Sequence, residues 1–156
     1  LKMAIERAQR HGRRFALLFL DLDRFKIIND TLGHAVGDKL LQLAASRLTT
    51  TVRREDMVAR WGGDEFVILV EEVANARGAA LLARKLVVAL AEPAQIGNDD
   101  VDTSVSIGIS IYPDDAETEG DLIKMADAAM YHAKACGRNN YQLYRATLKI
   151  ERIAWE

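Results

Sequence analysis

The run FALLFLDLD, residues 15–23, constrains the fold of this chain more than any other segment. Its first six side chains are all apolar, and its length suits a strand better than a helix. A strand without a polar face must be covered by packed elements on both sides of its sheet. The chain must therefore supply helices to both faces of a central sheet, as an α/β domain does.

The hydrophobic spacing along the rest of the chain changes repeatedly between helical and strand-like periods. Helical spacing is found at 1–11, 35–52, 74–91 and 121–137, and strand-like segments at 57–70, 103–112 and 141–144. Paired glycines in the middle of the 57–70 segment predict a β-hairpin, and GNDD at 97–100 predicts a turn. This order predicts a single α/β sheet flanked by helices.

Composition excludes several classes of function. Of the 156 residues, 49% are hydrophobic and 28% charged, and the formal net charge is -2. Nucleic-acid and anionic-membrane binding leave a basic footprint that this chain lacks, so we expect neither contact, whereas a small anionic ligand needs only local cations. Cys136 is the only cysteine, which fits a reducing cytoplasm, and we expect it to fill the core. No apolar run is long enough to span a bilayer.

Acidic side chains end the apolar strand and stand at the tip of the hairpin. Asp21 and Asp23 are two residues apart, so strand alternation places both on one face of the sheet. Asp64 and Glu65 belong to RWGGDEF, 60–66, where the glycines serve the turn but no acid is needed for it. If the hairpin lies beside the strand, Asp64 or Glu65 converges on Asp21 to form an all-oxygen site for a hard divalent cation, best Mg²⁺.

Strand alternation creates a conflict at this site, because it sends Asp64 and Glu65 to opposite faces of the sheet. Both can serve one ion only if the turn or the strand twist redirects one of them, and we expect Asp64 to be the ligand first. For Asp23 we favour capping of a helix that begins at Arg24 over a metal role. Asp21 has no such alternative, since an unpaired acid at the end of an apolar strand is costly to bury.

The segment after the strand combines polar residues with glycines. Asn29 and Asp38 offer the donors and acceptors that a guanine edge requires. An Asn-Asp pair followed by glycine is also a common turn, and a histidine such as His34 is more often a loop or packing residue than a ligand. These residues alone therefore leave nucleotide binding and simple turn formation both open.

Four stretches of the chain, in this order and spacing, resemble one known family. They are DLDRFKIINDTLGHAVGD, RWGGDEF, VSIGIS and ADAAMYHAKACGRNNY. Together they closely resemble the GGDEF family, the diguanylate cyclase domains of bacterial signalling, from about Phe15 to Tyr141. The resemblance implies a palm-like sheet related to those of nucleotidyl cyclases and polymerases. It also implies condensation of two GTP into cyclic di-GMP with release of pyrophosphate.

The resemblance assigns the acids to individual roles. Asp21 and Asp64 match the metal-binding carboxylates, and the backbone carbonyl of Leu22 matches a further ligand. The family pattern implies two Mg²⁺ ions per site, with Mn²⁺ as a substitute, which stabilise the attacking and leaving oxygens. Asp64 and Glu65 adjoin the reacting centre, where Glu65 matches the position that assists the 3′-hydroxyl.

Further positions match substrate contacts of the family. Asn29 and Asp38 match the positions that read guanine, and His34 matches another substrate contact. The positions near phosphate are the backbone amides of Arg24 and Phe25, the basic residues Lys26, Lys134 and Arg138, and the glycines Gly62 and Gly63. Lys134 and Arg138 are four residues apart, so we expect them on one helical face toward the β- and γ-phosphates. Without the resemblance, they equally suit a helix C-terminus.

A second cluster, Arg53-Arg54-Glu55-Asp56, fits the RxxD inhibitory pattern of the family, with MVARW between it and the glycines. The resemblance implies that Arg53 and Asp56 bind the product, cyclic di-GMP. An ungapped count from Phe66 adds Arg84 as a supporting basic position. The alternative is a surface ion pair, which contributes little to stability.

The resemblance also implies partners. Each domain of the family holds one GTP, so a homodimer is needed for reaction. We expect residues 1–145 to form the domain and 146–156 a linker helix toward another domain, with an EAL phosphodiesterase domain as the candidate, and a sensory domain elsewhere in the parent protein. Two rival functions are a non-catalytic module that binds GTP or cyclic di-GMP and a metal-dependent phosphohydrolase on an unrelated sheet.

Overall fold

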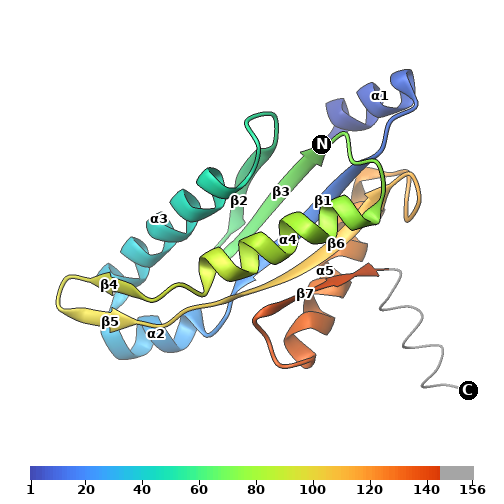
Figure 1. The fold of residues 1–156 in the computed structure, drawn as a ribbon. Helices are drawn as coiled ribbons and strands as arrows, with labels where there is room; N and C mark the ends of the chain where they lie inside the picture. The colour runs from blue at the N-terminus through green and yellow to red at the C-terminus, as the bar shows by residue number, and fades with distance from the viewer. Residues whose placement is uncertain (145–156) are drawn as a thin grey trace, which may run out of the picture.

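The computed structural model describes residues 1–144, and the linker helix expected at 146–156 lies outside the described residues. The central sheet has the strand order β2-β3-β1-β6-β7 (Figure 1). Its strands are β1 (Phe15–Leu22), β2 (Met57–Gly62), β3 (Glu65–Glu71), β6 (Val105–Tyr112) and β7 (Asn140–Leu143). The helices are α1 (Lys2–His11), α2 (Phe25–Leu32), α3 (His34–Thr51), α4 (Ala76–Leu90) and α5 (Glu119–Ala135), and β4 (Ala94–Ile96) pairs with β5 (Asp99–Val101) in a separate hairpin.

The predicted α/β class is confirmed, and the reason lies in β1. All of its residues are buried, between antiparallel neighbours β3 and β6. Leu18 and Leu20 join the core cluster under α3 and α4, whereas Leu17 and Phe19 join the cluster under α1 and α5. Each fully buried side chain of this size contributes about 1.5–3 kcal/mol, so the central strand requires a helical layer on both faces.

Helix α5 lies unusually close to β6, because Gly108 has no side chain. A Cβ at this position would lie 1.9 Å from the carbonyl oxygen of Ala126 and 2.2 Å from the amide nitrogen of Met130. Ser110 strengthens the contact, since its hydroxyl donates to the Leu122 carbonyl at 2.8 Å. The position of α5 over the sheet is therefore fixed by backbone packing.

Two expectations about single residues are wrong. Asp23 does not cap α2, which begins at Phe25 after Arg24 in the left-handed conformation and has no side-chain cap; the Asp23 carboxylate accepts hydrogen bonds from other elements. Cys136 is exposed rather than in the core, because it follows the last residue of α5, beyond the helical turn that packs on the sheet.

The expected turn at 97–100 is the tip of the β4–β5 hairpin. Among the described residues, no helix combines the length and apolarity that crossing a bilayer requires.

We predict that Gly108→Ala lowers the free energy of unfolding by about 1–3 kcal/mol, because a methyl group there must displace the backbone of α5. Urea denaturation followed by circular dichroism measures the change. Gly78→Ala is the matched control, since a Cβ at this exposed position in α4 meets no atom within 4 Å. The control should be stabilised by about 0.5–1 kcal/mol. Equal stability of the two variants would contradict the close packing of α5 on β6.

Candidate active site

The turn between β2 and β3 brings both hairpin acids beside β1. β2 ends at Gly62 and β3 begins at Glu65, which is paired directly with Asp21. Gly63, at φ 50°, and Asp64 form the turn, so Asp64 is not bound by strand alternation. One carboxylate oxygen from each of Asp21, Asp64 and Glu65 lies within 4.8 Å of the others. The turn thus removes the conflict that alternation predicts.

Backbone contacts hold this turn against β1. The amide of Leu22 donates to the carbonyl oxygen of Asp64 at 3.1 Å, which ties the turn to the end of the central strand. The guanidinium of Arg60 donates to the carbonyl oxygen of Gly63 at 3.0 Å. Sequence patterns do not identify Arg60 as part of the site, because its side chain acts on a backbone atom that no motif marks.

Burial and neighbouring acids raise the pKa of two of these carboxylates. Asp21 is 8% exposed, and burial raises its pKa to about 7, with Asp64 adding to the rise and Lys134 opposing it. Burial also raises the pKa of Glu65, with the charges of Asp64 and Asp127 adding to it. The site therefore holds more negative charge than its surroundings stabilise well.

The donor set fits a hard divalent cation. Asp21 Oδ2 accepts from the Lys134 ammonium at 2.5 Å, whereas Asp21 Oδ1 is buried and has no hydrogen-bond partner. A buried carboxylate oxygen without a partner is costly, and a cation bound by Asp21, Asp64 and Glu65 would satisfy it. All three donors are oxygens, which is the ligand type that Mg²⁺ prefers.

The two basic residues at the end of α5 do not share one helical face, contrary to expectation. Lys134 lies in the last turn of α5 and contacts Asp21. Arg138 lies beyond the helix, in the left-handed conformation at φ 64°, and is exposed. The helix ends because Gly137 takes φ 110° and the amide of Arg138 donates back to the Ala133 carbonyl at 3.1 Å.

The residues expected to read guanine lie on α2 and α3. Asn29 packs against Gly37, where a Cβ would lie 1.7 Å from Asn29 Oδ1, and this oxygen is buried without a hydrogen-bond partner. Asp38 lines a groove of about 520 Å³ together with Arg60 and Phe66. His34 is exposed at the first residue of α3. Lys26, also exposed, lies in the first turn of α2.

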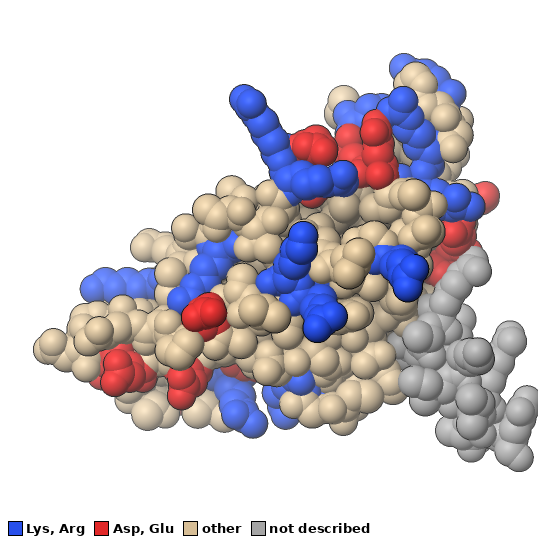
Figure 2. Space-filling model, in the orientation of Figure 1, with Lys and Arg blue, Asp and Glu red and all other residues tan. Residues whose placement is uncertain are grey.

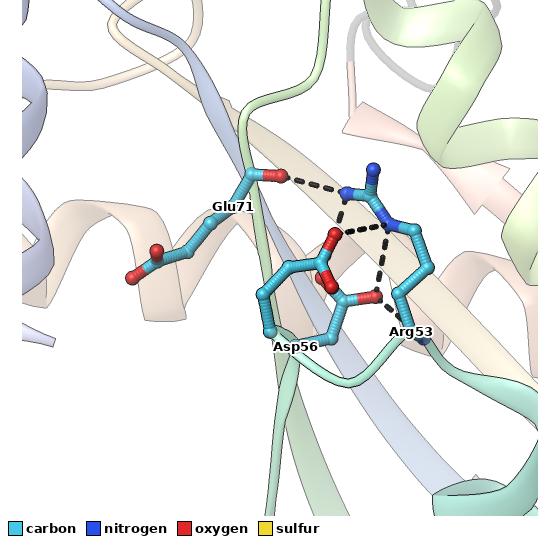
Figure 3. A network of polar contacts seen from close by, with 4 residues as sticks. Arg53, Asp56 and Glu71 are labelled. Carbon is cyan, nitrogen blue, oxygen red and sulfur yellow. Dashed lines mark hydrogen bonds and ion pairs between the residues drawn. The ribbon is translucent and has the colours of Figure 1, made fainter.

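The RxxD residues form a compact network at the other end of β3 (Figure 3). The amide of Arg53 donates to Asp56 Oδ2 at 3.0 Å, and the Arg53 guanidinium donates to the Glu71 carbonyl at 2.7 Å. The Asp56 side chain is fully covered, so this is more than a solvated surface pair. Arg84 lies on α4, where it lines a hollow with Arg138. Figure 2 shows basic side chains over α4, the helix that carries Arg77, Arg84 and Lys85.

Comparisons with known proteins agree with this geometry. A family model described as "Diguanylate cyclase, GGDEF domain" matches residues 1–140. The bifunctional diguanylate cyclase/cyclic di-GMP phosphodiesterase MucR of Pseudomonas aeruginosa is 50% identical over 148 residues, which are 95% of this chain and 22% of that protein. The diguanylate cyclase TpbB of the same species is 41% identical over 157 residues, covering 100% of this chain and 36% of that protein. The chain thus spans well under half of these relatives.

Solved structures give the same result. The crystal structure of the GGDEF domain of TpbB matches with a TM-score of 0.89 at 41% identity, over 92% of this chain and 89% of that one. The GGDEF domain of DgcB from Caulobacter crescentus, in complex with c-di-GMP, matches with a TM-score of 0.85 at 29% identity, over 93% and 86%. The sheet is that of a nucleotidyl cyclase-like domain. The chain belongs to the GGDEF family of diguanylate cyclase domains, which confirms the expectation from its motifs.

We predict that metal-free protein becomes less stable as the pH rises from about 4 toward 7. The pKa of Asp21 is about 7 in the folded protein, whereas its ordinary value is 3.8. Between these two pH values the folded state binds more protons than the unfolded chain, so the free energy of unfolding falls as the pH rises. Thermal unfolding across this range measures the effect, which Asp21→Asn should reduce. Mg²⁺ in mildly alkaline buffer should stabilise the wild type but not Asp21→Asn. Equal stabilisation of both proteins would contradict a metal site at Asp21.

Proposed function

We propose that this chain is a diguanylate cyclase domain that condenses two GTP into cyclic di-GMP and releases pyrophosphate. The observation that carries the proposal is the cluster of Asp21, Asp64 and Glu65 at the buried end of β1. A simple hairpin has no use for this cluster, because crowded carboxylates destabilise the fold unless a cation compensates them. Family membership supplies the reaction class, and the intact turn acids support catalysis rather than binding alone.

The acidic residues divide the work at the reacting centre. Asp21 and Asp64, with the carbonyl of Leu22, would hold Mg²⁺, which when bound stabilises charge on the attacking and leaving oxygens. Burial raises the pKa of Glu65, which makes this carboxylate a stronger base toward the 3′-hydroxyl. The Lys134 ammonium donates to Asp21, and it can also donate to phosphate oxygens of the substrate.

Guanine recognition falls to the pair of helices that follows β1. Asn29 offers an amide group that can donate, with an oxygen that no protein group uses, and Asp38 offers a carboxylate in the groove lined by Arg60 and Phe66. A carboxylate and an amide together match the donors and acceptor of a guanine edge, which supports GTP over ATP as the substrate. His34, at the start of α3, would contact the same nucleotide.

The product sets the number of domains required. Cyclic di-GMP contains two new phosphodiester bonds, and one site supplies one hydroxyl and one α-phosphorus in opposed directions. Two domains must therefore face each other antiparallel, each holding one GTP.

We also infer that Arg53 and Asp56 bind the product as an inhibitor, with Arg84 as a supporting cation. The c-di-GMP complex of DgcB supports product binding by a domain of this fold.

A second candidate is a regulatory module that binds GTP or cyclic di-GMP without turnover. It is supported by NbdA of Pseudomonas aeruginosa, which is named for breakdown of cyclic di-GMP and is 38% identical to this chain over 146 residues. In either case we infer that the domain lies in the cytoplasm and belongs to a multidomain parent protein, with an EAL-type phosphodiesterase domain as a candidate neighbour. Product analysis separates the two, since the module predicts unchanged GTP.

We predict that purified protein at high concentration converts GTP with Mg²⁺ into cyclic di-GMP, and that Asp64→Ala abolishes turnover. Loss of a metal-binding carboxylate at the reacting centre should reduce the rate at least about a hundredfold. Chromatography of the nucleotides measures the reaction. Glu6→Ala, which removes an exposed acid on α1 away from the cluster, is the matched control and should keep full activity. Intact GTP with the wild-type protein would contradict catalysis by this chain.

Arg53→Ala should relieve inhibition by cyclic di-GMP while leaving the initial rate unchanged. The guanidinium is the charged group of the cluster that can pair with product phosphates, so its loss should weaken product binding about tenfold or more. Calorimetry with cyclic di-GMP measures the affinity. Arg54→Ala removes the exposed neighbouring charge and controls for net charge. Equal product affinity in wild type and Arg53→Ala would rule out this site.

A further inference from the structure

Asp23 is buried, yet it belongs neither to the carboxylate cluster nor to a helix cap. Its side chain is almost fully covered, with 3% of the residue exposed. Its Oδ1 accepts from the Ser106 hydroxyl at 2.6 Å, and its Oδ2 accepts from the Ser104 hydroxyl at 2.5 Å and from the amide of Asn139 at 3.0 Å. Three donors therefore converge on one carboxylate, from β6, the segment before it and the loop after α5.

The contact with Asn139 reaches a loop in an unfavourable conformation. Arg138 and Asn139 are consecutive non-glycine residues with φ 64° and φ 50°, in the left-handed region that L-residues disfavour. Such a conformation persists only where surrounding contacts hold it. The Asn140 side chain holds one side of the loop, since it donates to the Arg138 carbonyl at 2.8 Å. Asp23 holds the other side through the Asn139 amide.

We propose that Asp23 is a positioning residue that fixes Arg138 for contact with the substrate triphosphate. The proposal rests on the proposed function and on the family resemblance, which assigns Arg138 to the β- and γ-phosphates. By accepting from the Asn139 amide, the carboxylate keeps the 138–139 turn left-handed and so directs the Arg138 side chain. Ser104 also holds Asp23, through its hydroxyl and through its carbonyl oxygen, which accepts from the Asp23 amide at 2.9 Å, so the loop stays in register with the strand that borders Asp21 even without the Ser106 contact.

The chemistry of the three donors defines which substitutions matter. Hydroxyl groups of Ser104 and Ser106 can rotate to accept as well as donate, but the Asn139 amide can only donate. Asp23→Asn can keep its carbonyl oxygen on Asn139 and turn its amide group toward Ser106. Asp23→Ala leaves the Asn139 amide without its acceptor. Alanine should therefore release the loop, and asparagine should largely preserve it.

Calorimetry with a nonhydrolysable GTP analogue and Mg²⁺ tests the proposal. Asp23→Ala should weaken binding about tenfold, as expected for loss of one charge-assisted phosphate contact, and Asp23→Asn should restore most of the affinity. In an Arg138→Ala background, Asp23→Ala should have no further effect, because the cycle isolates action through Arg138. Ser106→Ala is the matched control, since it removes a hydrogen bond to the same carboxylate but leaves the one from Asn139.

The outcomes distinguish this inference from the proposed function. Three results would overturn the inference alone, provided that the wild type binds the analogue tightly. They are an unchanged affinity in Asp23→Ala, additive losses of affinity in the double variant with Arg138→Ala, and a loss of affinity in Ser106→Ala equal to that in Asp23→Ala. Failure of the wild type to bind the analogue would overturn the proposed function and this role with it. Amide hydrogen exchange of wild-type protein gives a test without nucleotide or variants. The Asn139 amide should be protected despite its exposed loop, and rapid exchange would overturn the proposal.

Discussion

The crowding of three carboxylates at the end of a buried strand is the constraint on which the rest of this structure depends. Asp21 lies near the end of β1, and Asp64 in the adjacent turn and Glu65 at the start of β3 lie beside it. Burial and mutual repulsion raise the pKa of Asp21 to about 7, and the single ammonium of Lys134 offsets only part of the cost. A fold that retains this arrangement carries a local instability that a bound cation would relieve.

Glycines, which have no side chain, let the surrounding elements approach one another closely around this site. Gly108 allows α5 to rest on β6, which brings Lys134 to Asp21. Gly37 admits the side chain of Asn29 between α2 and α3. Gly63 provides the positive φ that turns Asp64 out of the strand pattern. In each case a Cβ would either clash with other atoms or strain the backbone, so these positions require glycine for close packing or for a positive φ.

The β2–β3 hairpin joins the two polar centres of the domain. Glu65, at one end of β3, belongs to the carboxylate cluster, and the carbonyl of Glu71, at the other end, accepts from Arg53. A strand of this length spans roughly 20 Å and is held by pairing with β1 along its whole length. A ligand that rearranged the Arg53 network would therefore act on a rigid element that carries the acids of the other centre.

The sequence by itself determined the α/β class, the central position of the 15–23 strand and the family, because apolar periodicity and motif spacing are local properties of the chain. It also identified Asp21, Asp64 and Glu65 as acids without a structural purpose. Only the tertiary structure decided how side chains are directed at turns and helix ends: that Asp64 escapes alternation, and that Cys136 is exposed. Lys134 meets Asp21 across 113 positions of sequence. Such contacts depend on how distant segments pack, and local periodicity contains no record of them.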